Sequence, residues 1–161
     1  AASDVYKRQM KKLVLASLFL AVSQMTMAVN WFENPSNPQN PQKLFIDLDS
    51  VQKHQFSNSR DYYITAWVKV IHPNNRVASN GQVYNTLSIF SYFDCKNRKM
   101  ADEIFLGYYG NNRNVVSYEK YNINKNSSEN WTKVAPNTMG EALFHMGCDA
   151  YEIGTKYGYQ F

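Results

Sequence analysis

The chain has 161 residues and a mass of 18.6 kDa, with 44% hydrophobic, 15% aromatic and 19% charged residues. This composition is that of one packed domain, and it excludes a multidomain machine or a disordered tail. The pI is about 9.0, but 4 of the 17 cations and 1 of the 13 anions precede Val29, which leaves a formal charge of +1 from there onward. The basic pI therefore does not point to nucleic acid or a membrane surface as a partner.

The amino end carries the pattern of a secretory signal peptide. Lys11 and Lys12 precede an apolar run of ten residues, and small residues stand at Thr26 and Ala28. The run is too short for a transmembrane anchor, which needs about 20 apolar residues. We expect a signal peptide over residues 10–28 and export through the inner membrane to the periplasm or cell surface. Because no cysteine follows the expected cleavage region, we expect no lipid anchor.

The rest of the chain divides into an arm and a domain. Residues 1–9 precede the expected start methionine and are left out of the fold. Residues 29–42 hold three of the five prolines among Asn and Gln, which predicts an extended arm before a domain over residues 43–161. Cys95 and Cys148 are the two cysteines, and an even count in an exported chain favours a disulfide. We expect no metal and no cofactor, because the histidines are scattered.

Alternation of apolar and polar residues predicts six antiparallel strands. They are expected at residues 43–51, 62–72, 84–95, 98–109, 115–121 and 131–135. On the second strand Val68 and Val70 share one face, whereas Trp67 and Lys69 lie on the other. A polar loop that holds Arg76 is expected to connect the second and third strands.

Two further details of the sheet follow from the same pattern. The odd positions from Leu87 to Cys95 share the apolar face of the third strand, so a disulfide from Cys95 would project from that face. On the fourth strand, Met100, Ile104 and Leu106 are expected on one face and Phe105 on the other.

After the strands the apolar period changes to that of a helix. Thr138 and Glu141 have the spacing of a capping box at a helix start. Four apolar residues then recur at helical spacing: Met139, Leu143, Met146 and Ala150. The predicted fold is therefore α+β, with a six-stranded antiparallel sheet and one C-terminal helix packed on one face.

The helix end determines where Cys148 points. If the helix stops at Gly147, as we expect, Cys148 can reach Cys95 and tie the helix to the sheet. If the helix continues, Cys148 points about 180° away from Met139. The spacing leaves both alternatives open.

No catalytic constellation is recognisable. Asp47 and Asp49 could form a carboxylate pair, but they also suit a solvated strand edge. Ser50 lacks the surroundings of a hydrolase nucleophile, and pairing it with His54 would require a fold back across the connection. His145 is more typical of a packed or surface histidine. We expect no enzyme and no nucleic-acid partner, and we interpret the many tyrosines as sheet packing and a binding face rich in Tyr and Asn.

Three stretches together resemble the surface-adhesin protein E family of Gram-negative bacteria. They are FIDLDSV at residues 45–51, SYFDCKNRKMADEIFLGYYGNNRNVVSY at 91–118 and WTKVAPNTMGEALFHMGC at 131–148. The resemblance covers roughly residues 44–151. It implies a six-stranded antiparallel sheet with a C-terminal helix tied by a disulfide, in agreement with the elements predicted above.

The resemblance also implies a function. Members of that family are non-enzymatic adhesins that bind host vitronectin, laminin and plasminogen, and they occur as dimers. Vitronectin binding there uses a basic segment before the cysteine strand. The matching segment here is 72–86, whose only Lys or Arg is Arg76, so Arg76 is the candidate binding residue. The alternative, favoured by the missing lipid-acceptor cysteine, is a periplasmic protein-binding or stress module with the same fold and no host ligand.

Overall fold

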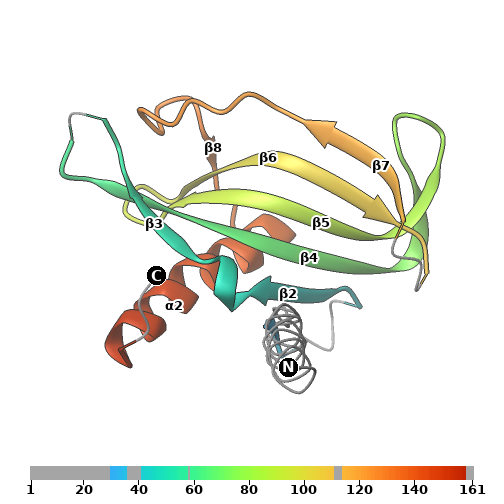
Figure 1. Cartoon of the computed structure of the whole chain (residues 1–161), viewed down its shortest axis with the longest axis horizontal. Helices are drawn as coiled ribbons and strands as arrows, with labels where there is room; N and C mark the ends of the chain where they lie inside the picture. The colour runs from blue at the N-terminus through green and yellow to red at the C-terminus, as the bar shows by residue number, and fades with distance from the viewer. Residues whose placement is uncertain (1–29, 36–40, 58, 111–113, 159–161) are drawn as a thin grey trace, which may run out of the picture.

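The computed structural model describes residues 30–35, 41–57, 59–110 and 114–158, and the expected signal peptide and the segment before it lie outside these residues. The described chain forms an antiparallel sheet above one long helix (Figure 1). The elements are β1 (Trp31–Glu33), β2 (Lys43–Asp47), the 3-10 turn η1 (Leu48–Ser50), β3 (Gln52–Gln55), β4 (Tyr62–Val77), β5 (Val83–Asp94), β6 (Lys99–Tyr108), β7 (Val115–Lys120), β8 (Thr132–Lys133) and α2 (Met139–Lys156).

The predicted antiparallel sheet with a C-terminal helix is confirmed. Its order is β1-β2-β4-β5-β6-β7, with β3 beside β4 and β8 beside β6. Because β2 and β3 pair with successive parts of β4, and β7 and β8 with successive parts of β6, the eight strands occupy six positions in the sheet. Part of the expected arm, Trp31–Glu33, pairs with β2 at the edge of the sheet.

The first predicted strand, 43–51, is wrong in its second half, because the chain turns after Asp47. The Asp47 carboxylate accepts the Asp49 N–H at 3.2 Å and caps η1. The Ser50 hydroxyl donates to the Asp47 carbonyl at 2.7 Å and accepts the Trp67 N–H at 2.8 Å. The side chain of Ser50 thus satisfies a backbone donor of β4 at the break between β2 and β3.

The polar loop predicted around Arg76 is also wrong, because β4 continues to Val77. The β4–β5 register shifts between Ile71 and Arg76, and Arg76 pairs opposite Tyr84. Pro73 has no N–H to donate to the neighbouring strand. It is accommodated because it lies at this irregularity, in an exposed part of β4. Arg76 is therefore presented from a strand of the hairpin, which rises at the right of Figure 1.

The predicted alternation along the fourth strand is broken by a bulge. Asp102 pairs with Ser91 and Ile104 with Phe90, so Glu103 is the extra residue. As a result Phe105 packs against the same core as Met100, whereas Ile104 lies opposite Phe90. A single inserted residue reverses every later side chain of a strand, which composition alone does not reveal.

Helix α2 begins as predicted but does not end at Gly147. The Thr138 hydroxyl accepts the Glu141 N–H at 3.2 Å at the amino end. The helix continues to Lys156, so Gly147 lies inside the helix and does not end it. A Cβ at Gly147 would lie 2.7 Å from the Phe93 ring, so the absence of a side chain lets the helix approach β5.

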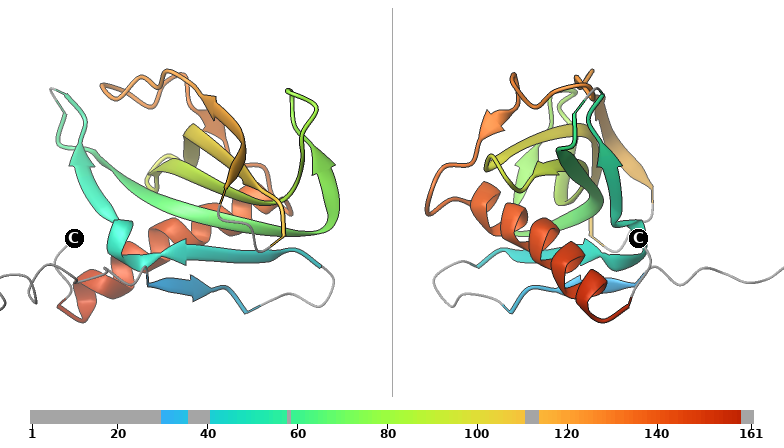
Figure 2. Two further views of the ribbon diagram at one scale, coloured as in Figure 1. Left: turned by 45° about the vertical axis from the view of Figure 1, so that its right-hand side comes forward. Right: turned by 90° about the vertical axis from the view of Figure 1, so that its left-hand side faces the viewer.

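The core on the helix side of the sheet is continuous from β2 to α2. The four apolar helix positions predicted from the spacing all belong to it. Its most deeply buried large side chains include Ile46, Ile64, Phe93 and Leu143. Figure 2 shows in two further views that α2 runs along this side of the strands.

The predicted disulfide is confirmed and joins β5 to the middle of α2. Cys95 and Cys148 have their sulfurs 2.08 Å apart and their Cα atoms 5.8 Å apart. A cross-link between residues 53 positions apart stabilises the fold by about 4 kcal/mol in the chain-entropy model. The bond therefore holds the helix against the sheet at the point where Gly147 makes its close approach.

We expect Gly147→Ala to destabilise the protein even though alanine favours helices. The new Cβ would overlap the Phe93 ring, and overpacking of this kind costs about 1–3 kcal/mol. Gly140→Ala is the matched control, because its Cβ would make ordinary contacts at 3.5 and 3.6 Å and gain helix propensity. Urea unfolding should rank Gly140→Ala at or above the wild type and Gly147→Ala below it, and equal stability of the two variants would contradict this account of the packing.

Candidate binding surface

Among the described residues, the face of the sheet opposite α2 is covered at one end only. There a cluster of buried aromatic side chains, Phe56, Tyr63, Tyr92 and Trp131, packs under the segment 121–131. This segment is drawn in orange along the top of Figure 1. The cluster is the second core of the domain. It includes Tyr63 and Tyr92, two of the tyrosines that the sequence could not assign to either packing or binding.

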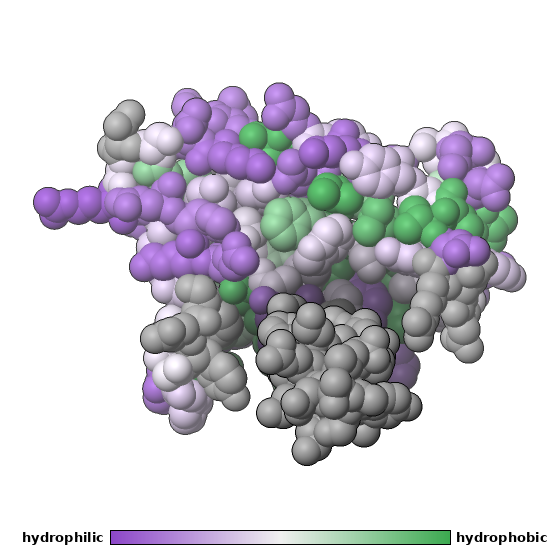
Figure 3. All heavy atoms as spheres, viewed as in Figure 1, coloured by the Kyte–Doolittle hydropathy of each residue, from purple (hydrophilic) through white to green (hydrophobic). Residues whose placement is uncertain are grey.

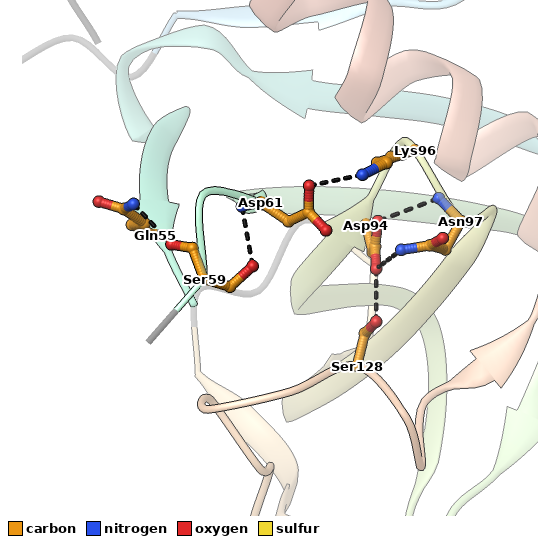
Figure 4. A network of polar contacts seen from close by, with 7 residues as sticks. All are labelled: Gln55, Ser59, Asp61, Asp94, Lys96, Asn97 and Ser128. Atoms are coloured by element: carbon orange, nitrogen blue, oxygen red, sulfur yellow. Dashed lines mark hydrogen bonds and ion pairs between the residues drawn. The ribbon is translucent and has the colours of Figure 1, made fainter. Parts of the chain in front are cut away.

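Hydrogen bonds to buried and half-buried groups fix this segment in place. The Asp94 carboxylate, fully buried, accepts from the Ser128 hydroxyl and from two N–H groups of Asn97 (Figure 4). The Lys99 ammonium donates to the Ser128 carbonyl at 2.9 Å. The indole N–H of Trp131 donates to the Asn124 carbonyl at 2.9 Å within the segment.

Glu103, the bulged residue of β6, is the acidic centre of these contacts. Its carboxylate accepts a hydrogen bond from the Tyr92 hydroxyl and lies 3.3 Å from the Lys125 ammonium and 3.7 Å from the Lys120 ammonium. The Tyr92 hydrogen bond, followed by the lysines, holds the pKa of Glu103 below its ordinary value. The bulge therefore turns an acidic side chain toward the covering segment.

The remainder of this face, beside β7 and the β4–β5 hairpin, has no covering element among the described residues, and we call it the open face. Its side chains form three rows across the strands. The first row runs from β2 to β7 and holds Lys43, Ile71, Thr86, Tyr108 and Val115. The second runs from β1 to β7 and holds Glu33, Phe45, Lys69, Ser88, Leu106 and Tyr118. The third runs from β4 to β7 and holds Trp67, Phe90, Ile104 and Lys120. In Figure 3 hydrophobic side chains gather over the right-hand half of the sheet.

A lysine lies among aromatic rings on the open face. The Lys69 ammonium is 3.9 Å from the centroid of Trp31 and 4.8 Å from that of Phe45. Burial lowers the pKa of Lys69, and the nearby Asp47 carboxylate opposes that shift. Cation–π contacts of this kind hold a charge in place while leaving its N–H donors available. The open face thus combines apolar area with positioned positive charge.

Arg76, the residue chosen from the sequence, stands beside the open face and not within it. It is exposed at the far end of β4. Its charge contributes, after burial, to lowering the pKa of the buried His72. The tip of the same hairpin contacts β7, because the Ser79 hydroxyl donates to Glu119 at 2.6 Å. Arg76 is therefore held on a supported hairpin.

The residues considered for catalysis do not form a catalytic group. Ser50 is used by the backbone at the β2–β3 break, and His54 contacts the Thr65 hydroxyl at 3.0 Å and stacks on Tyr63. The Asp47 carboxylate caps η1, and its pKa is raised by burial. The described part of the chain contains no cluster of three or more His, Cys, Asp or Glu that could hold a metal ion.

Asp49 and His145 are brought to one place, on the helix side of the sheet. Both line an apolar groove between β1–β2 and the second half of α2. His145 is exposed, with its Nε2 4.0 Å from the Glu141 carboxylate. The groove is a possible binding site by its shape, but its polar groups show no mutual hydrogen bonds of the kind that a nucleophile and a base require.

The family assignment follows from a comparison with family models. The model of surface-adhesin protein E matches residues 31–149, which include all eight strands and most of α2. The chain belongs to the surface-adhesin protein E family. No curated protein and no solved structure matches it in the corresponding comparisons.

Membership in the surface-adhesin protein E family supports a surface adhesin-like role with a protein partner, and it favours a non-enzymatic protein at the surface or secreted. Within the described residues, no helix is long and apolar enough to cross a membrane. These statements agree with an open face that combines apolar and aromatic side chains with the Lys69 ammonium.

The open face could not be recognised as a site from the sequence, although the alternation placed Trp67 and Lys69 on the correct side of their strand. Alternation shows which residues share a face, but it does not show which face remains uncovered. That depends on how far the segment 121–131 extends, and its anchors Asp94 and Ser128 are far apart in the sequence. The one indication of this surface in the sequence was a predicted strand that carries apolar residues on both of its faces.

We expect the ionised form of Glu103 to stabilise the folded state. Because its pKa is lower when folded than the ordinary 4.5, its contribution is present above about pH 4.5 and is lost as the pH falls through the folded pKa. Glu103→Gln should therefore cost about 1 kcal/mol at pH 7 and progressively less below pH 4.5, as measured by urea unfolding. In Tyr92→Phe, an NMR titration should find the Glu103 pKa closer to 4.5. A stability difference independent of pH would contradict this role of the carboxylate.

Proposed function

We propose that this chain is an exported envelope or surface protein that binds a host protein through its open face. The proposed ligands are vitronectin, laminin or plasminogen. The observation that carries the proposal is the row structure of the open face, where exposed and half-buried apolar side chains lie next to Lys69 and Lys120. Family membership supports the adhesin role, and the ligands remain part of the proposal.

The open face has properties expected of a protein-binding surface. Tyr118 is 60% exposed and Val115 is 47% exposed, while their cross-strand neighbours Leu106 and Tyr108 are half-buried. An exposed apolar patch on a folded domain commonly marks an interaction site. Side chains carried by paired strands lose little conformational freedom on binding, which favours affinity.

The cations beside the apolar rows favour an acidic partner surface. Lys69 lies within the rows and Arg76 lies on the adjoining hairpin, whereas the Lys120 ammonium is 3.7 Å from the Glu103 carboxylate. Opposite charges across an interface speed association and select the partner, and they are screened by salt. Binding should therefore weaken as salt is added.

We expect open-face substitutions to weaken binding of the host ligand. Tyr118→Asp places a negative charge among the apolar rows, and the affinity for immobilised vitronectin, laminin or plasminogen should fall at least about tenfold. Tyr157→Asp is the matched control, because Tyr157 is 70% exposed directly after α2 and lines the groove on the helix side of the sheet, away from the open face. Biolayer interferometry with each ligand measures both variants.

The same assay separates the hairpin from the open face. If Arg76 forms part of the vitronectin site, Arg76→Ala reduces vitronectin binding and leaves the fold unchanged by circular dichroism. Equal binding by the wild type, Tyr118→Asp and Tyr157→Asp would contradict the proposed role of the open face. Absence of binding to all three ligands would contradict the host-ligand assignment.

The location of the protein provides a separate test. If it is a surface adhesin, protease added to intact cells of the native host should remove it while a periplasmic control protein survives. An antibody to residues after 29 detects the result. If the chain is instead protected and released by osmotic shock, the alternative applies, namely a periplasmic protein-binding or stress module with the same fold.

A further inference from the structure

The strand β1 leaves one edge of the sheet unpaired in the described chain. The Asn34 N–H donates to the Leu44 carbonyl at 2.9 Å, and the Leu48 N–H donates to the Asn30 carbonyl at 3.0 Å. In antiparallel pairing the bonded residues alternate, so the N–H and C=O groups of Trp31 and Glu33 point away from β2. These outward backbone groups can pair with another extended chain.

An apolar groove lies directly beside this edge, on the helix side of the sheet. It has a volume of about 780 Å³ and runs between β1–β2 and the second half of α2, which lie near one another in both views of Figure 2. Phe32 and Ile46 line it from the strands, and Met146 and Ile153 line it from the helix. Phe32 and Ile153 are 53% and 56% exposed, so the groove is accessible.

The charges at the groove are negative. The carboxylates of Asp49 and Asp149 line it, and the described lining residues include no Lys or Arg. His145 is the one lining side chain among them that can become cationic. A ligand that carries its own positive charge would complement this rim, because opposite charges across an interface favour association; both carboxylates are exposed, so added salt should weaken the attraction.

We propose that β1 and the groove together bind an extended peptide segment of a partner protein, with apolar side chains at alternate positions and Lys or Arg next to them. The segment adds a strand to β1 through the outward groups of Trp31 and Glu33. Every second side chain then points to the helix side, the side on which Phe32 already lies, and enters the groove. The cations reach Asp49 and Asp149.

The edge and the groove favour this occupant over a small apolar molecule. A volume of this size lies within the range of roughly 300 to 1,000 Å³ that small-molecule sites occupy, so volume alone does not decide. A small apolar molecule, however, would use neither the outward backbone groups of β1 nor the two carboxylates. A strand-forming cationic peptide uses both.

The proposal does not depend on the function of the open face. The groove lies on the helix side of the sheet, whereas Tyr118 and Lys69 lie on the other side. Variants that abolish one activity can therefore be tested for the other.

The test uses a fluorescein-labelled heptapeptide, KTVTITK, whose odd-numbered side chains share one face. Fluorescence anisotropy with the purified protein should show saturable binding. The charge-reversed peptide ETVTITE should bind at least about tenfold more weakly. Amide NMR signals of Trp31 and Glu33 should shift during the titration with KTVTITK and gain protection from hydrogen exchange.

Two matched pairs of variants locate the site. Glu33→Pro removes an outward N–H and should bind at least about tenfold more weakly than Glu33→Ala, which loses the same carboxylate but keeps the N–H. Ile153→Arg places a cation in the groove and should abolish binding, whereas Thr155→Arg makes the same charge change on α2 outside the groove lining and should not.

Three results of the peptide assays would overturn the proposal. They are absence of binding by KTVTITK, equal binding of KTVTITK and ETVTITE, and equal affinity within either pair of variants that fold like the wild type by circular dichroism. Binding of an uncharged apolar dye in the groove without peptide binding would also overturn it and would identify a small-molecule site.

Discussion

The close approach of α2 to β5 is the constraint on which the rest of the structure depends. Gly147 lets the helix backbone rest against the Phe93 ring, and the adjacent Cys148 is bonded to Cys95 at the end of the same strand. With the helix held there, one face of the sheet is buried in a continuous apolar core. The other face has to be covered by another segment or remain exposed to solvent, and its exposed part is the proposed binding surface.

The second face is divided by the segment 121–131. Polar contacts to Asp94 and Glu103, which are fully and partly buried, fix the segment in place. They hold it over the aromatic cluster, and it does not reach the rest of the face. A single domain thus has a second small core and an uncovered sheet surface on the same face. The bulge at Glu103 links the two, because it turns the carboxylate toward the segment and places Ile104 opposite Phe90 on the open face.

The two proposed sites use different physical properties. The open face offers rows of apolar side chains with cations, carried across neighbouring strands of the sheet, and it suits the surface of a folded partner. The β1 edge offers unpaired backbone groups beside a groove with an acidic rim, and it suits an extended cationic segment. The two proposed sites would therefore place two kinds of partner on opposite sides of the sheet.

Most strand positions, the helix start and the pairing of Cys95 with Cys148 could be predicted from the sequence, because alternation, a capping residue and an even cysteine count are local or compositional signals. The strands β1 and β3 and the extension of β4 to Val77 could not. The resemblance to the surface-adhesin protein E family rests on such signals in a shared order. The tertiary structure decided the role of Gly147, the bulge at Glu103 and the strand position of Arg76. Each depends on a partner distant in the sequence: the Phe93 ring, the β5 register, or Tyr84 across the hairpin. The open face could not be predicted for the same reason, since its exposure depends on where the segment 121–131 and α2 end in space.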